Sequence, residues 1–493
     1  MTSSNGDIRL PGPEPGNPPV VTSQNRWQAM SVALVAGFMT LLDVSIVNVA
    51  LPSIRADLQL GSGELQWVLS GYALTFGLLL VPAGRYGDAR GRRNAFMLGL
   101  AVFTLASAAA GLATSALWLI IARLVQGAAA GVVNPQVSGL IQQLFEPHER
   151  GKPFGLLGAT IGISTAVGPL LGGLLIQVFG AEQGWRWIFY INVPIGLAAI
   201  VLGHRWIPAR PRQERSHDSL DPIGVALLGV GVFLLLLPLV QEREWPGNGK
   251  WLLVVAAAAV LAGFWTWERR FGRHSTSVID LDLFRVRSYA LGALVGVLYF
   301  GGFTSIFFTY TLFLQNGLHY TALQAGLAIT PFALGSAVTA AIGGRKVDHT
   351  GRTLVAAGLI TVALGLAGTV VVLYVVTGSA AGWATVVPLL VAGLGSGLVI
   401  SPNQTLTLSE VPVRRAGSAA AVLQTGQRIG AAIGIAGVGA VFFNRLAHHD
   451  GDWGLAFRTS LTVTIAFVLA ALVAAGTDVL AGRRHHDQEV AAR

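Results

Sequence analysis

The sequence predicts an all-α membrane protein with fourteen transmembrane helices, arranged as two pseudo-symmetric six-helix bundles with two further helices inserted between them. Three observations predict this fold: a series of long apolar runs, a charged motif that occurs twice, and an uneven distribution of Lys and Arg. The chain of 493 residues is 53% apolar and only 12% charged, and its mean hydropathy is +0.61. A soluble protein of this length could not present so little charge to water, so the bilayer must be its solvent.

The apolar runs give the number of spans. About 20 apolar residues are needed to cross a hydrocarbon core of roughly 30 Å. Reading with that window places spans at 29–52, 66–84, 95–113, 117–140, 154–178, 187–204, 222–240, 251–267, 289–314, 321–342, 354–376, 382–402, 416–442 and 457–480. The uncharged stretches 94–122 and 353–409 are each too long for one span, so we expect each to fold back once.

The repeated motif divides the chain into halves. The residues Gly84, Arg85, Asp88, Gly91 and Arg92 recur as Gly344, Arg345, Asp348, Gly351 and Arg352. Each copy is a charged turn between two apolar runs, and duplicated bundles are typical of transporters that work by alternating access. We therefore expect a disordered cytoplasmic tail at 1–28, a six-helix bundle at 29–206, a linker with two extra transmembrane helices at 207–273, a second six-helix bundle at 274–481, and a cytoplasmic tail at 482–493.

The Lys and Arg residues orient the chain. With a cytoplasmic N-terminus, 25 of the 33 lie in inside segments, six lie in outside loops, and two, Arg123 and Arg428, lie within spans. This bias follows the positive-inside rule and predicts a multi-pass protein of the cell membrane with both termini in the cytoplasm. The net charge of +9 is therefore explained by orientation in a membrane and does not indicate binding to nucleic acid.

Five motifs occur in a fixed order along the chain, at 41–52, 84–93, 123–127, 158–173 and 185–194. Together they resemble the major facilitator superfamily, and specifically its fourteen-helix branch of drug:proton antiporters. The resemblance covers nearly the whole chain outside the two tails. It implies a proton-driven secondary transporter, and not an enzyme, that exports lipophilic drugs or antibiotics by alternating access. It also implies a monomer that needs no cofactor and has protons, a small lipophilic substrate and the lipid bilayer as its partners.

Asp43 is the carboxylate that the predicted spans place in the middle of a helix. An ionised carboxylate is costly to bury in hydrocarbon, so Asp43 should face a cavity or a partner. Such a group can take up a proton on one side of the membrane and release it on the other. The resemblance places Arg123 beside it, and we expect these two residues to couple transport to protons. The alternative is an ion pair that serves packing alone.

Other polar residues within spans are candidates for the wall of a substrate cavity: Asn48, Gln126, Gln424, Gln427 and Arg428. For Arg428 and its two neighbouring glutamines the alternative is contact between helices. Because Arg123 and Arg428 together outnumber Asp43, the membrane interior carries a net charge of +1. A neutral or amphipathic substrate is therefore as plausible as a cation.

The repeated motif supplies a candidate cytoplasmic gate made of Gly84, Asp88, Gly91, Arg92, Asp348 and Arg352. Its glycines permit a tight turn, and Asp88 can meet the N-terminal end of a neighbouring helix, where an anion is favoured. The resemblance implies that the first copy is a latch that holds the outward-facing state, with Asp348 and Arg352 as a weaker counterpart. The alternative is a loop whose arginines merely anchor it in the cytoplasm.

The predicted fifth span carries the motif associated with antiporters, consisting of Gly158, Gly162, Gly168, Pro169 and Gly172. Glycines four residues apart let helix backbones approach closely, and the proline removes one helical hydrogen bond. We expect a closely packed helix that can bend. The inserted spans at 222–240 and 251–267 carry no central charge and are expected to be a lipid-facing linker.

Other classes of function remain open at this point. A metabolite or sugar carrier of the same superfamily, or a non-transporting membrane receptor, would share most of these features. A membrane enzyme or a channel is less consistent with the sequence, which has no phosphate-binding loop, no His/Glu pair for a metal on a helix, and no filter-like polar loop. The absence of cysteine also excludes disulfides and thiolate metal sites, and no metal or cofactor is expected.

Overall fold

The computed structural model describes residues 23–180, 182–208, 221–240, 245, 247–271, 281–449 and 451–491. This part of the chain is helical, has no strand, and contains fourteen helices long and apolar enough to cross a membrane. The predicted fold class is therefore confirmed. Most of the expected N-terminal tail, residues 1–22, lies outside the described residues.

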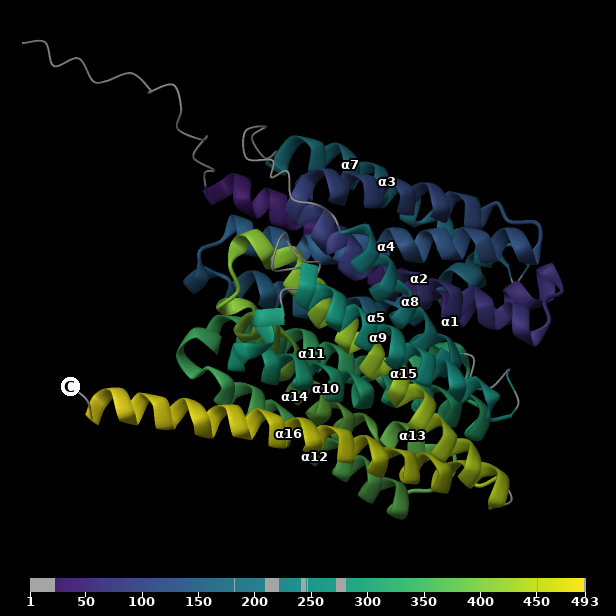
Figure 1. Ribbon diagram of the computed structural model, residues 1–493. Helices are drawn as coiled ribbons and strands as arrows, with labels where there is room; N and C mark the ends of the chain where they lie inside the picture. Colours follow the sequence, from purple (N-terminus) through teal and green to yellow (C-terminus); the bar gives the residue numbers. More distant parts are fainter. Residues whose placement is uncertain are drawn as a thin grey trace, which may run out of the picture.

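The helices form two halves. The first half contains α1 (Ser23–Leu58), α2 (Ser62–Arg90), α3 (Arg92–Gly111), α4 (Ala116–Leu144), α5 (Gly151–Phe179), α6 (Gly184–Tyr190) and α7 (Asn192–Trp206). The second contains α10 (Arg287–Leu312), α11 (Ala322–Thr350), α12 (Arg352–Val375), α13 (Ala380–Ala384), α14 (Val386–Ser409), α15 (Ala416–His448) and α16 (Trp453–Ala491). In Figure 1 the purple and blue helices of the first half lie above the green and yellow helices of the second.

Both long uncharged stretches fold back as expected. In the first, α3 ends at Gly111 and α4 begins at Ala116, where the Ser115 hydroxyl accepts a hydrogen bond of 3.4 Å from the Trp118 backbone N–H. A serine at this position satisfies one of the free N–H groups at a helix start. In the second stretch α12 ends at Val375, and α13 and α14 return through the bundle.

A single glycine separates two helices in each copy of the repeated motif. Only Gly91 lies between α2 and α3, and its φ is 106°. Only Gly351 lies between α11 and α12, and its φ is 55°. Glycine adopts such positive φ values without the clash that a Cβ would cause. The shared sequence thus produces the same sharp helix–helix corner in both halves.

The two halves meet along two pairs of helices. Helix α5 packs along α11, and α2 packs along α15. One large apolar cluster includes Tyr72 and Phe76 of α2 together with Ala419, Ala420 and Leu423 of α15. Burial of this shared apolar surface holds the halves together along α2 and α15.

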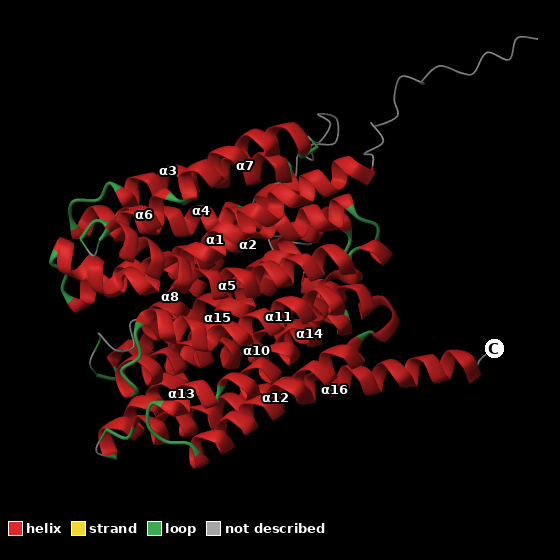
Figure 2. Ribbon diagram, turned by 180° about the vertical axis from the view of Figure 1, so that it is seen from behind, coloured by secondary structure: helices red, strands yellow, loops and turns green. Residues whose placement is uncertain are grey.

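The inserted helices α8 (Pro222–Val240) and α9 (Leu252–Phe271) have different environments. Helix α9 packs mainly against α8 and is largely exposed, as expected for a lipid-facing helix. Helix α8 instead contacts both α2 and α15, and its Leu228, Val232 and Leu236 belong to the apolar cluster that joins the halves. In Figures 1 and 2, α8 is drawn at the level where the two halves meet, between α2 and α15.

Candidate functional site

Asp43 of α1 and Arg123 of α4 form a buried ion pair. The guanidinium Nη1 lies 2.5 Å from Asp43 Oδ2, and the exposed fractions of the side chains are 0% and 1%. Asp43 lies near the middle of α1 and Arg123 is the eighth residue of α4, and both helices are long enough to span a membrane. The structure therefore brings together the two residues that the sequence assigned to proton coupling, 80 positions apart in the chain.

Gln126 and Asn192 complete the shell around this pair. Asp43 Oδ1 accepts hydrogen bonds from Gln126 Nε2 at 2.8 Å and from Asn192 Nδ2 at 3.1 Å. Arg123 in turn donates to Gln126 Oε1 at 2.8 Å and to the Val68 carbonyl at 3.1 Å. Gln126 was predicted to line the substrate cavity, but it is fully buried because its amide bridges the two charged groups.

Asn192 is a site residue that the sequence analysis did not identify. Helix α6 ends at Tyr190 and α7 begins at Asn192, so a break in this transmembrane segment brings the side chain to Asp43. Its Nδ2 also donates to Ser107 Oγ at 3.0 Å, and Ser107 donates to the Phe189 carbonyl at 2.9 Å. The sequence feature that could have identified Asn192 is its polar side chain, which is costly in hydrocarbon, within an otherwise apolar span.

All the groups that contact the Asp43 carboxylate are donors. This arrangement suits an ionised carboxylate, which only accepts hydrogen bonds. A protonated Asp43 would need an acceptor for its own O–H. Asn192 Oδ1 is buried and has no hydrogen-bond partner among the described residues, so rotation of this amide would supply that acceptor. The site therefore has a group that can respond to protonation of Asp43.

Two stacked aromatic rings extend from this cluster toward the second half. The Arg123 guanidinium carbon lies 4.2 Å from the centre of the Tyr72 ring. Tyr72 stacks on Phe76, with ring centres 6.1 Å apart, and the Arg428 guanidinium carbon of α15 lies 4.3 Å from the centre of the Phe76 ring. A guanidinium over an aromatic face is attracted by the ring quadrupole. The two arginines thus flank one aromatic pair, from opposite halves.

The remaining predicted cavity residues divide into two groups. Gln424, Gln427 and Arg428 of α15 are partly exposed, and Gln424 Nε2 donates to Ser138 Oγ of α4 at 3.4 Å. Asn48 of α1 is exposed, and its Nδ2 donates to the Val44 carbonyl at 3.1 Å.

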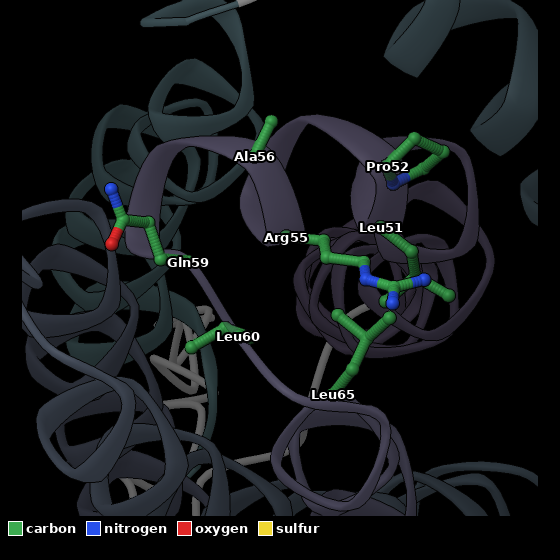
Figure 3. A pocket seen from close by; sticks show the side chains of 7 residues that line it. All are labelled: Leu51, Pro52, Arg55, Ala56, Gln59, Leu60 and Leu65. Carbon is green, nitrogen blue, oxygen red and sulfur yellow. The ribbon is translucent and has the colours of Figure 1, made fainter.

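An open pocket of about 630 Å³ lies at the C-terminal end of α1. This end of the molecule is opposite the one that contains Asp88. It is lined by Leu51, Pro52, Arg55, Ala56, Gln59, Leu60 and Leu65. Figure 3 shows the Arg55 side chain directed toward Leu51 of the same helix and Leu65 of α2. Asn48 precedes Pro52 by one helical turn, on the same face of α1. The pocket therefore combines an apolar wall with one guanidinium.

Asp88 joins the two halves at the opposite end. Its carboxylate accepts hydrogen bonds from the backbone N–H groups of Gly417 and Ser418, at 3.0 and 2.8 Å, and from Ser418 Oγ at 2.9 Å. These donors form the start of α15, where free N–H groups and the helix dipole favour an anion. The structure places Asp88 at a helix N-terminus, as the sequence predicted.

Arg92 and Gly84 strengthen this junction. Arg92 pairs with Asp88 at 2.9 Å and donates to the carbonyls of Gly139 in α4 and Val413 just before α15. Gly84 packs so closely against Gly417 that an added Cβ would lie 2.6 Å from its carbonyl oxygen. Backbones of the two halves therefore touch at this point, and only a glycine fits.

The second copy of the motif has different partners. Asp348 is exposed, whereas Arg352 is largely buried and pairs with Asp478 of α16 at 2.7 Å. Asp478 also pairs with Arg287 of α10 at 3.0 Å. The geometry does not support the expected joint action of Asp348 and Arg352, because Arg352 pairs with the carboxylate of Asp478 in another helix. This second cluster lies entirely within the second half.

The glycines of α5 serve two interfaces. An added Cβ on Gly158 would lie 3.0 Å from Ala340, and one on Gly162 would lie 2.9 Å from the Ala333 carbonyl, both in α11 of the other half. Gly168 and Gly172 instead pack against α1, near Ser45 and Ile46. Pro169 follows Gly168 directly, inside the helix. The motif therefore connects the contact between halves to the helix that carries Asp43.

Comparison with known proteins supports one family. The sequence model described as Major Facilitator Superfamily matches residues 33–435. The chain is 37% identical to a probable actinorhodin transporter of Streptomyces coelicolor over 88% of this chain and 76% of that protein. It is 34% identical to a puromycin resistance protein of Streptomyces alboniger, over 91% of this chain and 89% of that protein.

A solved structure of a proton:xylose symporter bound to 6-bromo-6-deoxy-D-glucose has a similar fold. The TM-score is 0.64, with 17% sequence identity over 91% of this chain and 96% of that chain.

Proposed function

The chain belongs to the Major Facilitator Superfamily, and from that premise we propose that it exports small lipophilic molecules, such as antibiotics, in exchange for protons. It is a multi-pass membrane transporter and not an enzyme. The relatives named for actinorhodin transport and puromycin resistance support an antibiotic as the exported molecule.

The observation that carries the proposal is the buried pair of Asp43 and Arg123. A carboxylate and a guanidinium without solvent exposure in the middle of a transmembrane bundle are costly, and such groups are usually retained for proton or ion movement. Protonation would remove the negative charge of Asp43 and leave Arg123 without its counter-ion. The free energy of the cluster therefore depends on whether Asp43 carries a proton.

The opposite end of the molecule supplies the second element of the mechanism. The contacts of Asp88 and Arg92 with the start of α15 close the bundle at that end. In the proposed cycle these contacts break when the substrate site opens toward the cytoplasm. Asp43 then releases its proton on that side, and a new substrate molecule binds before the bundle closes again.

The membrane potential is sufficient for this exchange. One proton that crosses about 100 mV releases about 2.3 kcal/mol. Since each tenfold concentration ratio corresponds to about 1.4 kcal/mol, this supports a gradient of roughly fifty-fold for a neutral substrate. In this proposal a single chain is sufficient, since its two halves supply both walls of the transport pathway. Both termini lie in the cytoplasm, as the distribution of Lys and Arg indicates.

Everted membrane vesicles from a host that lacks its own efflux pumps provide the test. After the interior has been acidified by respiration, addition of puromycin or another candidate antibiotic should release protons if the protein is present. The Asp43→Asn variant should be inserted in the membrane in equal amount and should release none. Proton release by the variant equal to that of the unaltered chain would refute the role of Asp43.

A further inference from the structure

Arg428 differs from Arg123 in having no counter-ion among the residues that the structure describes. Arg123 is held by Asp43, by the Gln126 side-chain oxygen and by the Val68 carbonyl. Arg428 contacts the face of Phe76, and no carboxylate or hydrogen-bond acceptor among the described residues binds it. Arginine stays charged at all physiological pH values. A cation therefore lies within a membrane-spanning helix with its five N–H donors unused.

These donors are accessible. The Arg428 side chain is partly exposed, and its nitrogens are not among the buried polar atoms that lack a partner. Water or a ligand can therefore reach them. The Phe76 ring is buried and fixed by its stack with Tyr72. Contact with the face of this ring therefore holds the Arg428 guanidinium in one orientation.

One glutamine lies beside the free guanidinium. Gln424 lies one helical turn before Arg428 on the same face of α15, and its Nε2 makes one long hydrogen bond of 3.4 Å to Ser138. Gln427 instead lies against α10, where an added Cβ on Gly296 would be 3.7 Å from its Nε2. Gln424 and Arg428 therefore offer amide and guanidinium donors to the same region, which suits a planar anion that accepts two hydrogen bonds.

The other charges near the middle of the bundle do not favour a cationic ligand. Asp43 is enclosed by three donors and is not exposed, so it does not present its charge to a substrate. The open pocket at the end of α1 also carries a positive group: Arg55 lies there among leucines and forms no ion pair with a described residue. An amphipathic acid would thus meet the same combination of guanidinium and apolar surface at both places.

We propose that Arg428, with Gln424 beside it and the Phe76 ring against its guanidinium, binds an anionic group of the exported molecule. The substrate class is then a lipophilic acid, in which a carboxylate or phenolate is attached to an aromatic or other apolar body. This inference rests on the proposed function and specifies the substrate of that same site.

Equilibrium binding to the purified full-length chain in detergent tests the charge preference without any proton gradient. Naphthoic acid, naphthylmethanol and naphthylmethylamine share one ring system and are, at neutral pH, an anion, a neutral molecule and a cation. The acid should bind at least tenfold more tightly than the other two. Arg428→Gln should remove this preference, and Arg428→Lys, which keeps the charge, should retain part of it. Phe76→Leu should weaken binding of the acid a few-fold, since it removes only the aromatic support.

Arg445→Gln is the matched control, because it removes a guanidinium from an exposed position on the same helix. It should leave the preference for the acid unchanged, and thermal unfolding should confirm that all variants are folded. Equal affinities of the three probes, no saturable binding of the acid, or a preference for the acid that survives Arg428→Gln would overturn the inference. If that happens while export still depends on Asp43, only the substrate class is wrong; loss of proton-coupled export from the unaltered chain would instead contradict the function itself.

Discussion

Asp88 and Ser418 are 330 residues apart in the chain, yet Asp88 Oδ2 accepts two hydrogen bonds from Ser418, one from its backbone N–H and one from its hydroxyl. Asp88 lies in the last turn of α2 in the first half, and Ser418 lies in the first turn of α15 in the second half. One carboxylate therefore satisfies N–H groups at a helix start that would otherwise lack partners in a buried junction. The bond between these residues depends on the two halves being closed at this end.

Asp88→Asn should shift the protein toward a form that is open at this end. The amide keeps the shape of the side chain but removes the charge that interacts with the α15 dipole and with Arg92, a loss of about 1–3 kcal/mol. This corresponds to a change of roughly five- to 150-fold in the ratio of closed to open molecules. Because the chain has no native cysteine, spin labels on cysteines introduced at the exposed positions Arg90 and Arg414 can report the distance between the halves directly.

The repeat supplies the control for this experiment. Asp348 occupies the same position in the second copy but is exposed, so Asp348→Asn should leave the distribution of distances unchanged. If Asp88→Asn and Asp348→Asn give the same distribution as the unaltered chain, the Asp88 contacts do not determine closure.

Asp43→Asn should lower stability as well as abolish proton exchange. The substitution leaves the Arg123 cation buried without a counter-ion, which typically costs 3–5 kcal/mol. The double variant Asp43→Asn with Arg123→Gln removes both charges and should recover most of the loss, while proton exchange stays absent. Thermal unfolding in detergent and proton release from vesicles measure the two properties separately. Recovery of proton exchange in the double variant would show that the pair is structural.

Asn192→Leu should lower both the stability of the protein and its proton-coupled export. The leucine removes one of the three donors to the buried Asp43 carboxylate, and the loss of a hydrogen bond to a charged group costs about 1.5–3 kcal/mol. Thermal unfolding in detergent and antibiotic-dependent proton release from vesicles measure the two properties.

Ser107→Ala is the comparison for the Asn192 variant. It removes a neighbour of Asn192 but no contact to Asp43, so its Tm and its proton release should change much less. A Tm and a proton release for Asn192→Leu that equal those of the unaltered chain would mean that the hydrogen bond from Asn192 to Asp43 is not required.

The sequence predicted the spans and the need of Asp43 for a partner because each depends on a strong local signal, whereas the resemblance to the superfamily identified that partner as Arg123. Twenty apolar residues have few alternatives to a transmembrane helix, and a lone carboxylate in such a helix requires a partner. Gly91 and Gly351 likewise occupy equivalent corners because both copies need a residue that tolerates positive φ.

Long-range partners were not predictable in the same way. Asp478 lies near the end of the last predicted span, and nothing local shows that it replaces Asp348 as the partner of Arg352. The break between α6 and α7 that turns Asn192 toward Asp43 also depends on tertiary packing. Gln126 was placed in the wrong environment, because helical position alone does not distinguish a side chain that faces a cavity from one that bridges a buried ion pair.

Gly168→Ala should destabilise the contact between α5 and α1, whereas Gly173→Ala should not. A Cβ at position 168 would overlap Ser45 and lie 3.1 Å from the Ile46 backbone nitrogen, while one at position 173 would meet nothing within 4 Å. Both changes add one methyl group to the same helix, so they differ only in what that group contacts. Overpacking typically costs 1–3 kcal/mol, and for Gly168→Ala this should appear as a lower Tm together with reduced export. Since α1 carries Asp43, displacement of α1 by the methyl group would also disturb the geometry of the Asp43–Arg123 pair. Equal Tm values for the two variants would show that the close approach at Gly168 is not required for packing, and the antiporter motif would then need another explanation.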